Sequence, residues 1–274
     1  MFNEIGEEKM SKDIRRIRVY SNKLNKSIQV CETVTEKLRG YGFEIVEESP
    51  DLVVCIGGDG TFINALKNLN FDTETVYVGI HTGHLGFLQE VNTQDIDYFI
   101  NCLKNSHYKI ERHRIQETTV TCSGNSEKFH TFNEVVIRDD NLKVIHIEIN
   151  IDENSFERFS GDGIIISTPI GSTAYNMSAG GGLVFPSLDI LQLTPLAPLN
   201  SGAYRCITNS ILVPPDKIIN ITPLNRKDIS ICIDGEVRTF KCVDTIQSKM
   251  SPKYIKMLRL ENYSFWTRIK EKFL

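Results

Sequence analysis

The sequence predicts an α/β domain followed by a β-rich domain, and two patterns along the chain support this order. Through the first hundred or so residues, short apolar strands alternate with helices, which is typical of a sheet built from βαβ units. From Tyr108 to about Lys249, short segments rich in Val, Ile and Thr are separated by turn residues, which predicts antiparallel β structure. We therefore expect an α/β domain over residues 1–107, a β-rich domain over 108–250 and a C-terminal segment over 251–274.

Hydrophobic periodicity places the elements of the α/β domain. The apolar run that ends at Ile56 is followed by glycines, which is typical of a strand buried on both faces of a parallel sheet. Apolar residues recur at helical spacing from Ile28 to Leu38, and Gly40 ends that helix. In chain order, we expect strands at 17–20, 43–46, 51–56 and 76–80, and helices at 28–38, 61–69 and 93–103.

Two helical segments are expected beyond the α/β domain. The small residues of 171–182 suit a short helix that interrupts the β-rich domain. Residues 263–274 form an amphipathic pattern, which requires an apolar surface to cover. We expect this last helix to pack back on the body of the protein, and a membrane-surface role is the weaker alternative. Its apolar residues are Phe265, Trp266, Ile269 and Phe273.

Charge and composition narrow the classes of function. The formal net charge is −4 and no long basic run occurs, so we expect no nucleic-acid partner. No stretch of ~18 consecutive apolar residues is present, and the first residues are acidic and polar where a secretory signal would be basic and then apolar. We therefore expect a cytoplasmic protein without a membrane span.

The seven cysteines predict neither a disulfide framework nor a zinc site. Their number is odd, and the chain has no C-x-x-C pair and no histidine at ligand spacing to them. Cys55 lies inside an apolar run, where it is expected to pack as a small buried residue.

The Gly-Gly-Asp-Gly-Thr motif at 57–61 follows a buried strand and opens a helix. At such a turn unpaired N–H groups and the helix dipole favour an anion, and glycines allow phosphate oxygens to approach the backbone. The motif lacks the P-loop lysine and the G-x-G-x-x-G spacing, so neither of those mechanisms applies. Asp59 is suited to accept a proton or to bind a metal. The alternative is a plain turn in which Asp59 caps the helix.

The His-Thr-Gly-His-Leu-Gly-Phe loop at 81–87 also follows a strand. Ligands of open α/β sheets bind beyond the carboxyl ends of the strands, so this loop is expected in the same crevice as Asp59. His81 and His84 suggest a metal site, but no third ligand is near and the glycines indicate a loop. We expect Phe87 to form a wall of the pocket instead.

Two motifs of the β-rich domain carry polar groups that suit a nucleotide. Asn133 and Glu134 precede a strand, where they are able to bond ribose hydroxyls or an adenine edge, although an ordinary strand-end turn would also accept them. The stretch 162–182 contains a buried strand, Ser-Thr-Pro, and a Gly-Ser-Thr-Ala-Tyr helix start. It predicts a second anion site with an aromatic face for a base.

Taken together, these motifs resemble NAD kinases of the bacterial type. The resemblance spans about residues 16 to 260, with the motifs in the family's order. The Gly-Gly-Asp-Gly core alone is less specific, because phosphofructokinases and diacylglycerol-type lipid kinases have similar motifs. The sequence departs from the family pattern at Ile170, where threonine is commoner, and at Gly182, where proline is usual.

The resemblance implies a Rossmann-like α/β domain and a β-sandwich-like domain that hold NAD between them. It implies a phosphotransferase that moves the terminal phosphate of ATP, or of another donor, to the 2′-hydroxyl of the adenosine ribose of NAD. Mg²⁺ would be bound with the substrate, and a homo-oligomer, a dimer or tetramer, is expected. A diacylglycerol-type lipid kinase and a non-catalytic nucleotide sensor are the alternatives. The sequence leaves open the donor, be it ATP, another triphosphate or polyphosphate, and the choice between NAD and NADH.

The resemblance also assigns residues. Asp59 would be the base that activates the 2′-hydroxyl, and Asp162 would reach toward the nicotinamide side. Asp234 and Gly235 fit a family position near the site, although a hairpin turn explains them equally well. The residues that would cradle phosphates are Gly57, Gly58 and Gly60. The residues that would contact NAD are Phe87, Asn133, Glu134, Asp162, Thr173, Ala174, Tyr175 and Ser178.

Overall fold

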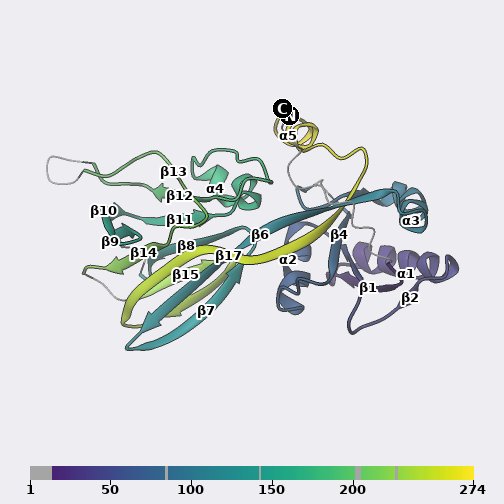
Figure 1. Cartoon of the computed structure of the whole chain (residues 1–274), viewed down its shortest axis with the longest axis horizontal. Helices are drawn as coiled ribbons and strands as arrows, with labels where there is room; N and C mark the ends of the chain where they lie inside the picture. The colour runs from purple at the N-terminus through teal and green to yellow at the C-terminus, as the bar shows by residue number, and fades with distance from the viewer. Residues whose placement is uncertain (1–13, 84–85, 142, 201–204, 226–227) are drawn as a thin grey trace. The chain divides into compact units, whose positions relative to one another are not determined.

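The chain forms two compact units in the computed structural model (Figure 1). The structure describes residues 14–83, 86–141, 143–200, 205–225 and 228–274. One unit comprises Met1–His113 and Tyr254–Leu274, and the other comprises Arg114–Lys253. Two long strands, β6 (Tyr108–Cys122) and β17 (Val243–Leu260), belong to both units.

The first unit is built on a parallel sheet. Strands β17, β4, β3, β1 and β2 lie side by side in this order, and β5 also pairs with β4. All five residues of β3 are buried, as the apolar run predicted. The strand bounds are β1 Arg16–Ser21, β2 Glu44–Ile45, β3 Leu52–Ile56, β4 Val76–His81 and β5 Val91–Asn92. The helix bounds are α1 Asn25–Gly40, α2 Asp59–Asn68, η1 Thr93–Asp95, α3 Ile96–Lys104 and α5 Phe265–Phe273.

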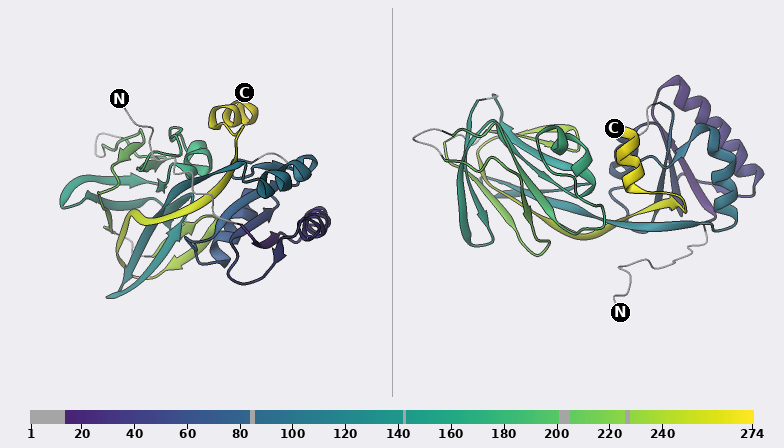
Figure 2. Two further views of the ribbon diagram at one scale, coloured as in Figure 1. Left: turned by 45° about the vertical axis from the view of Figure 1, so that its right-hand side comes forward. Right: turned by 90° about the horizontal axis from the view of Figure 1, so that it is seen from above.

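Helices cover both faces of this sheet (Figure 1 and Figure 2). Because side chains alternate along a strand, Val76 and Val78 of β4 face α1 and α3 in one apolar cluster. Tyr77 points to the other face, where its ring lies 6.1 Å from that of Phe62 in α2. This two-sided cover is the arrangement that makes the carboxyl ends of the strands available for a ligand.

The second unit is a sandwich of two β-sheets. One sheet has six antiparallel strands in the order β13, β12, β11, β8, β15, β16, and the other joins β10, β9, β14 and β17 with β6 and β7. Isoleucines from both sheets share one core, Ile147 and Ile149 from β9 with Ile164 and Ile231 from the six-stranded sheet. The strand bounds are β7 Asn125–Thr131, β8 Glu134–Asp139, β9 Ile145–Ile151, β10 Asn154–Gly161, β11 Gly163–Ser167, β12 Leu191–Leu196, β13 Ile211–Val213, β14 Ile219–Pro223, β15 Ile229–Ile233 and β16 Glu236–Phe240.

The predicted fold class is confirmed, but the helix expected in the β-rich domain is shorter than the segment predicted for it. The helix expected over 171–182 is replaced by a 3₁₀ turn, η2 (Ile170–Thr173), and a single turn, α4 (Tyr175–Ser178). Ala174 separates the two with a ψ of −137°, which is outside the helical region, and three glycines follow α4 at 180–182, so a longer helix cannot continue. The C-terminal helix α5 begins after Ser264, whose hydroxyl accepts a hydrogen bond from the Thr267 N–H, and it belongs to the first unit as predicted.

Within the described part of the chain, no helix is both long enough and apolar enough to cross a membrane.

Candidate active site

The turn between β3 and α2 requires glycine at its first position. Gly57 has a φ of +152°, and a Cβ there would lie 2.3 Å from the Thr61 hydroxyl oxygen. Its N–H donates to the Ile80 carbonyl at 2.9 Å, so this group already has a partner in the sheet. Gly57 therefore shapes the turn through its conformation and small size.

The start of α2 is open at the next glycines. Gly58 and Gly60 are exposed, and a Cβ on either would have no described atom within 4 Å. The first N–H groups of an α-helix have no partner inside the helix, and they carry the positive end of its dipole. The backbone at these two positions is thus able to approach an anion closely.

The Asp59 carboxylate is bound by the backbone of the loop that follows β4. Its Oδ2 accepts the Phe87 N–H at 3.0 Å, and its Oδ1 accepts the Leu88 N–H at 3.0 Å. The Gln89 amide nitrogen lies 3.5 Å from Oδ1. A Cβ at Gly86 would lie only 2.1 Å from Oδ1, so glycine is required for this close approach. Asp59 does not cap α2, because its side chain bonds to this loop.

Phe87 packs on the C-terminal helix. Its ring is 9% exposed and stacks on Phe273 of α5, with centroids 5.3 Å apart and planes at 30°. His81, at the start of the same loop, contacts the Gly83 carbonyl through Nδ1 and the Asn92 side-chain oxygen through Nε2. His84 lies outside the described residues. Among the described residues, no three His, Cys, Asp or Glu side chains form a group that suits a metal ion.

Asp234 organises the start of β8 in the second unit. It occupies the β15–β16 turn with a φ of +44°, followed by Gly235 at +82°. Its carboxylate accepts N–H groups from Phe132 at 2.8 Å and Asn133 at 2.7 Å, and a longer one from Glu134 at 3.3 Å. Asp234 is therefore both a hairpin-turn residue and the acceptor that orders the Asn-Glu motif.

The segment after β11 packs directly on this motif. The Thr168 N–H donates to the Asn133 carbonyl at 2.9 Å, and the Thr168 hydroxyl donates to the Phe132 carbonyl at 2.6 Å. A Cβ at Gly171 would lie 2.2 Å from the Asn133 carbonyl oxygen. The Ser-Thr-Pro and Asn-Glu motifs, which are far apart in the sequence, thus form one polar cluster.

Glu134 is buried without a complete set of hydrogen bonds. Its side chain is 8% exposed, and its Oε2 has no hydrogen-bond partner among the described residues. Burial, and then the nearby charge of Asp234, raise the pKa of Glu134 to about 8. The carboxyl group is therefore protonated at pH 7 and is able to donate an O–H to a ligand.

The remaining predicted NAD contacts lie at both ends of β11. Tyr175 is 41% exposed, its hydroxyl bonds to Arg138 Nη2 at 2.7 Å, and the guanidinium lies 6.0 Å from the ring centroid. Thr173, Ala174 and Ser178 belong to the same short helical region as Tyr175. Asp162 is exposed just before β11, about 17 Å of strand away, so the unit does not bring it together with the others.

Sequence reasoning missed several residues that support the site. Arg138 and Phe273 contact predicted residues, and Asn176 donates to the Gln192 side-chain oxygen at 2.6 Å beneath α4. Gly181 packs against this pair, since a Cβ there would lie 2.2 Å from Asn176 Nδ2. No local pattern marks these contacts, because each depends on residues that are distant in the chain.

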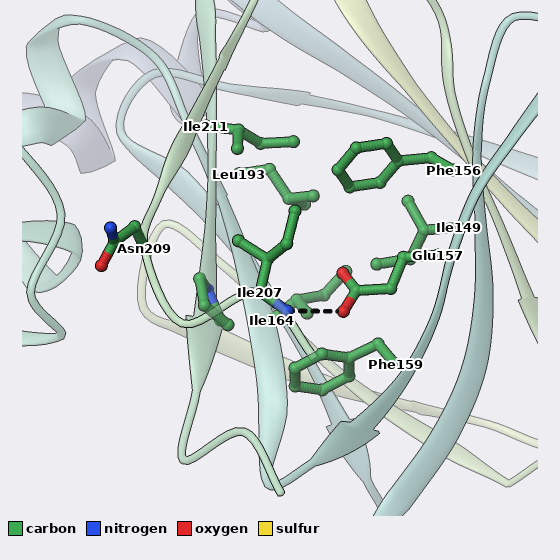
Figure 3. A pocket seen from close by; sticks show the side chains of 10 residues that line it. Ile149, Phe156, Glu157, Phe159, Ile164, Leu193, Ile207, Asn209 and Ile211 are labelled. Carbon is green, nitrogen blue, oxygen red and sulfur yellow. Dashed lines mark hydrogen bonds between the residues drawn. The ribbon is translucent and has the colours of Figure 1, made fainter. Parts of the chain in front are cut away.

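Two hollows occur elsewhere in the second unit. The first, lined mostly by apolar side chains together with Glu157 and Asn209, offers only about 10 Å³ to water-sized molecules, which is the space of a single water (Figure 3). The Glu157 carboxylate accepts the Ile207 N–H at 2.7 Å beside it. The second measures about 500 Å³ and is lined in part by His146, Arg158 and Arg205. Neither lining includes a predicted NAD contact.

The aspartate-bearing glycine turn and the polar strand-end cluster of the β-sandwich are features expected of a nucleotide-binding phosphotransferase, and comparison with known proteins supports this class. Family models for the ATP-NAD kinase N-terminal domain and the ATP-NAD kinase C-terminal domain match residues 4–108 and 132–260. The chain is 40% identical over 275 residues to the NAD kinase of Finegoldia magna, covering 97% of this chain and 100% of that protein. The chain belongs to the NAD kinase family.

A further relative agrees with this assignment, and two solved structures share the fold. The NAD kinase of Latilactobacillus sakei is 32% identical over 262 residues, covering 94% of this chain and 97% of that protein. Yeast NADH kinase, solved with NADH, has the same fold with a TM-score of 0.83 at 19% identity, covering 96% of this chain and 88% of that one. An NAD kinase from Archaeoglobus fulgidus, solved with ATP, has a TM-score of 0.70 at 23% identity, covering 94% and 97%.

Proposed function

We propose that this chain transfers the terminal phosphate of ATP to the 2′-hydroxyl of the adenosine ribose of NAD, giving NADP. The observation that carries the proposal is the orientation of the Asp59 carboxylate by the Phe87 and Leu88 N–H groups at the open start of α2. Relatives named as NAD kinases, and solved relatives with bound ATP or NADH, support this choice of substrates.

Asp59 serves as the general base in this proposal. Oδ1 accepts from both the Leu88 N–H and the Gln89 amide, whereas Oδ2 accepts the Phe87 N–H and keeps a second lone pair, so the carboxylate remains able to accept a proton through Oδ2. It takes the proton of the 2′-hydroxyl while that oxygen forms a bond to the γ-phosphorus. The bond between the γ-phosphorus and the bridging oxygen breaks, and ADP leaves.

The glycine turn supplies electrostatic stabilisation of the phosphates. Phosphoryl transfer requires mainly alignment and positive charge around the spreading negative charge. The open backbone at Gly58 and Gly60 contacts the triphosphate in this proposal, and Gly57 keeps the turn in shape. Mg²⁺ enters with the triphosphate as part of the donor substrate and neutralises the charge of the phosphates.

The polar cluster of the second unit binds the adenosine part of NAD in this proposal. Protonated Glu134 supports this role, because an unpartnered buried O–H is satisfied by a ligand acceptor. The exposed Tyr175 ring offers an aromatic face to the base, and Asp162 contacts the nicotinamide half. The other proposed NAD contacts are Phe87, Asn133, Thr173, Ala174 and Ser178.

Three further features belong to the proposal. The protein acts in the cytoplasm, it assembles as a homo-oligomer, a dimer or a tetramer, and the first domain carries the phosphate turn while the second binds NAD. The donor is ATP, with other triphosphates and polyphosphate as alternatives that the assay below separates.

Product analysis tests this function. Purified protein is incubated with NAD and Mg²⁺ together with ATP, GTP or polyphosphate, and NADP is measured with an NADP-specific dehydrogenase. We expect ATP-dependent NADP carrying its new phosphate on the adenosine 2′-oxygen, as located by ³¹P NMR. A parallel incubation with diacylglycerol should give no phosphorylated lipid. Binding of NAD without any phosphorylated product would instead make the chain a nucleotide sensor.

A further inference from the structure

The loop that orients Asp59 is held at one end by β4 and β17. We define the Asp59 loop as residues 86–90. The Glu90 N–H donates to the Gly79 carbonyl of β4 at 2.8 Å. The Glu90 carboxylate accepts the Leu260 N–H at 2.9 Å and pairs with Arg259 at 3.1 Å, and both charged side chains are 3% exposed. This end of the loop is therefore anchored by the backbone and by a buried ion pair.

The other end of the loop contacts the C-terminal helix. Phe87, whose N–H donates to Asp59 Oδ2, stacks its ring on Phe273 in the last turn of α5. Because one residue makes both contacts, the packing of the Phe87 ring on Phe273 restrains the backbone N–H that orients the carboxylate. Figure 1 draws α5 in yellow beyond the end of β17.

The start of α5 is also fixed within the first unit. The Arg259 guanidinium lies 3.9 Å from the centroid of the Tyr263 ring, immediately before the helix. Arg259 also bonds to Glu111 at 3.0 Å, and Glu111 contacts His113 at 3.2 Å. The buried Arg259 cluster thus connects the anchored end of the Asp59 loop to the helix that contacts its other end.

We propose that Phe273 is a positioning residue for catalysis, which sets the direction of the Asp59 carboxylate through Phe87. The inference rests on the proposed role of Asp59 as the base. A carboxylate that rotates or shifts by about 1 Å no longer meets the incoming hydroxyl in line, and such misplacement costs on the order of 100-fold in rate. In-line alignment is needed in the transition state more than in the ground state, so the larger effect falls on kcat, although Phe87 is also a proposed NAD contact.

Substitution of Phe273 tests the proposal in the full-length protein. Phe273→Ala should lower kcat by roughly 10- to 100-fold, a loss well beyond any change in the KM and the Kd for NAD, which Phe87 is proposed to contact. Phe273→Tyr keeps the stacked ring and should restore most of the rate. Trp266→Ala is the matched control, because this aromatic residue lies on the same helix, is 63% exposed and packs its ring on Phe265. It should retain the wild-type kcat.

A second variant perturbs the same contact from the opposite side. Gly86→Ala places a methyl group against Asp59 Oδ1 without altering α5, so it should produce the same selective loss of kcat. Thermal melting of each variant confirms that the first unit stays folded. A wild-type kcat in Phe273→Ala, or equal losses in Phe273→Ala and Trp266→Ala, would overturn the proposal.

Combination with Asp59→Asn separates this inference from the proposed function. If Phe273 acts through Asp59, the double variant should be no slower than Asp59→Asn alone, because no base remains for Phe273 to position. Multiplied losses would show that Phe273 acts independently and would overturn the inference. An Asp59→Asn variant with full activity would instead contradict the role of Asp59 itself.

Discussion

The buried carboxyl of Glu134 makes a quantitative prediction about stability. Its pKa is about 8 in the folded chain and about 4.5 for an ordinary glutamate, with burial as the main cause and the charge of Asp234 as the second. Between these values the folded chain holds a proton that the unfolded chain has lost. Stability therefore falls as pH rises from about 4.5 to about 8.

The size of this effect follows from the width of the pH interval. Each pH unit within it costs about 1.4 kcal/mol, so this group alone lowers the free energy of unfolding by roughly 3 kcal/mol between pH 4.5 and pH 7. Glu134→Gln keeps a neutral donor of similar shape and removes the titration. The free energy of unfolding of Glu134→Gln, relative to that of wild type, should therefore increase by that amount from about pH 4.5 to about pH 7.

Urea unfolding at several pH values measures this difference. The free energies of unfolding of wild type and Glu134→Gln should diverge steadily from pH 5 to pH 8. Glu127→Gln is the control, because this side chain is 54% exposed on β7, and it should follow wild type. Parallel curves for wild type and Glu134→Gln would refute a protonated Glu134.

Two further predictions concern the first unit. Burial opposes the charge of Glu111, but His113 and Arg259 together lower the pKa of Glu111 to about 2. The contribution of the Glu111 carboxylate to stability is therefore complete above about pH 4.5 and is lost as pH falls toward about 2. As pH is lowered from 5 to 2, the melting temperature should therefore fall more steeply in wild type than in Glu111→Gln. Equal slopes for the two proteins would contradict the contact of Glu111 with His113 and Arg259. Gly57→Ala forces a Cβ against Thr61 at a positive φ and should lower the free energy of unfolding by roughly 2–4 kcal/mol in chemical denaturation, whereas loss of less than half that amount would show that the turn adapts.

The sequence predicted the features of this fold that depend on local pattern. The continuous apolar run of β3, the glycine turn after it and the amphipathic α5 all follow from residue spacing and backbone preference within a short window. The change of pattern near Tyr108 likewise coincides with the start of β6 at that residue.

The sequence did not predict the contacts that orient the site. Asp59 bonds to backbone N–H groups 28 and 29 residues away, and a backbone N–H carries no residue type that a motif can record. Phe273 was recognised as part of an apolar helix face, but its partner Phe87 was not identified, because the two residues are distant in the chain. The pKa of Glu134 depends on burial and on a turn 100 residues away, and neither is visible along the chain.

The short helix at 171–182 shows where local reasoning was wrong. Small residues suggested a short helix over 171–182, whereas the α-helix is confined to Tyr175–Ser178 and Gly171 is required for contact with the Asn133 carbonyl. Glycines that serve a close approach and glycines that end a helix look alike in a sequence. Only the packing of β8 against this segment distinguishes them.

The account rests on one carboxylate acting as a base, and a single comparison of rate with affinity tests it most directly. Asp59→Asn is measured for kcat with ATP and for the Kd of NAD by calorimetry, beside Asp97→Asn, which alters an aspartate in the first turn of α3 as Asp59 lies in the first turn of α2. We predict that Asp59→Asn loses at least about 1,000-fold in kcat while the Kd stays within a few fold, and that Asp97→Asn keeps both values. A kcat near that of wild type in Asp59→Asn would contradict the account.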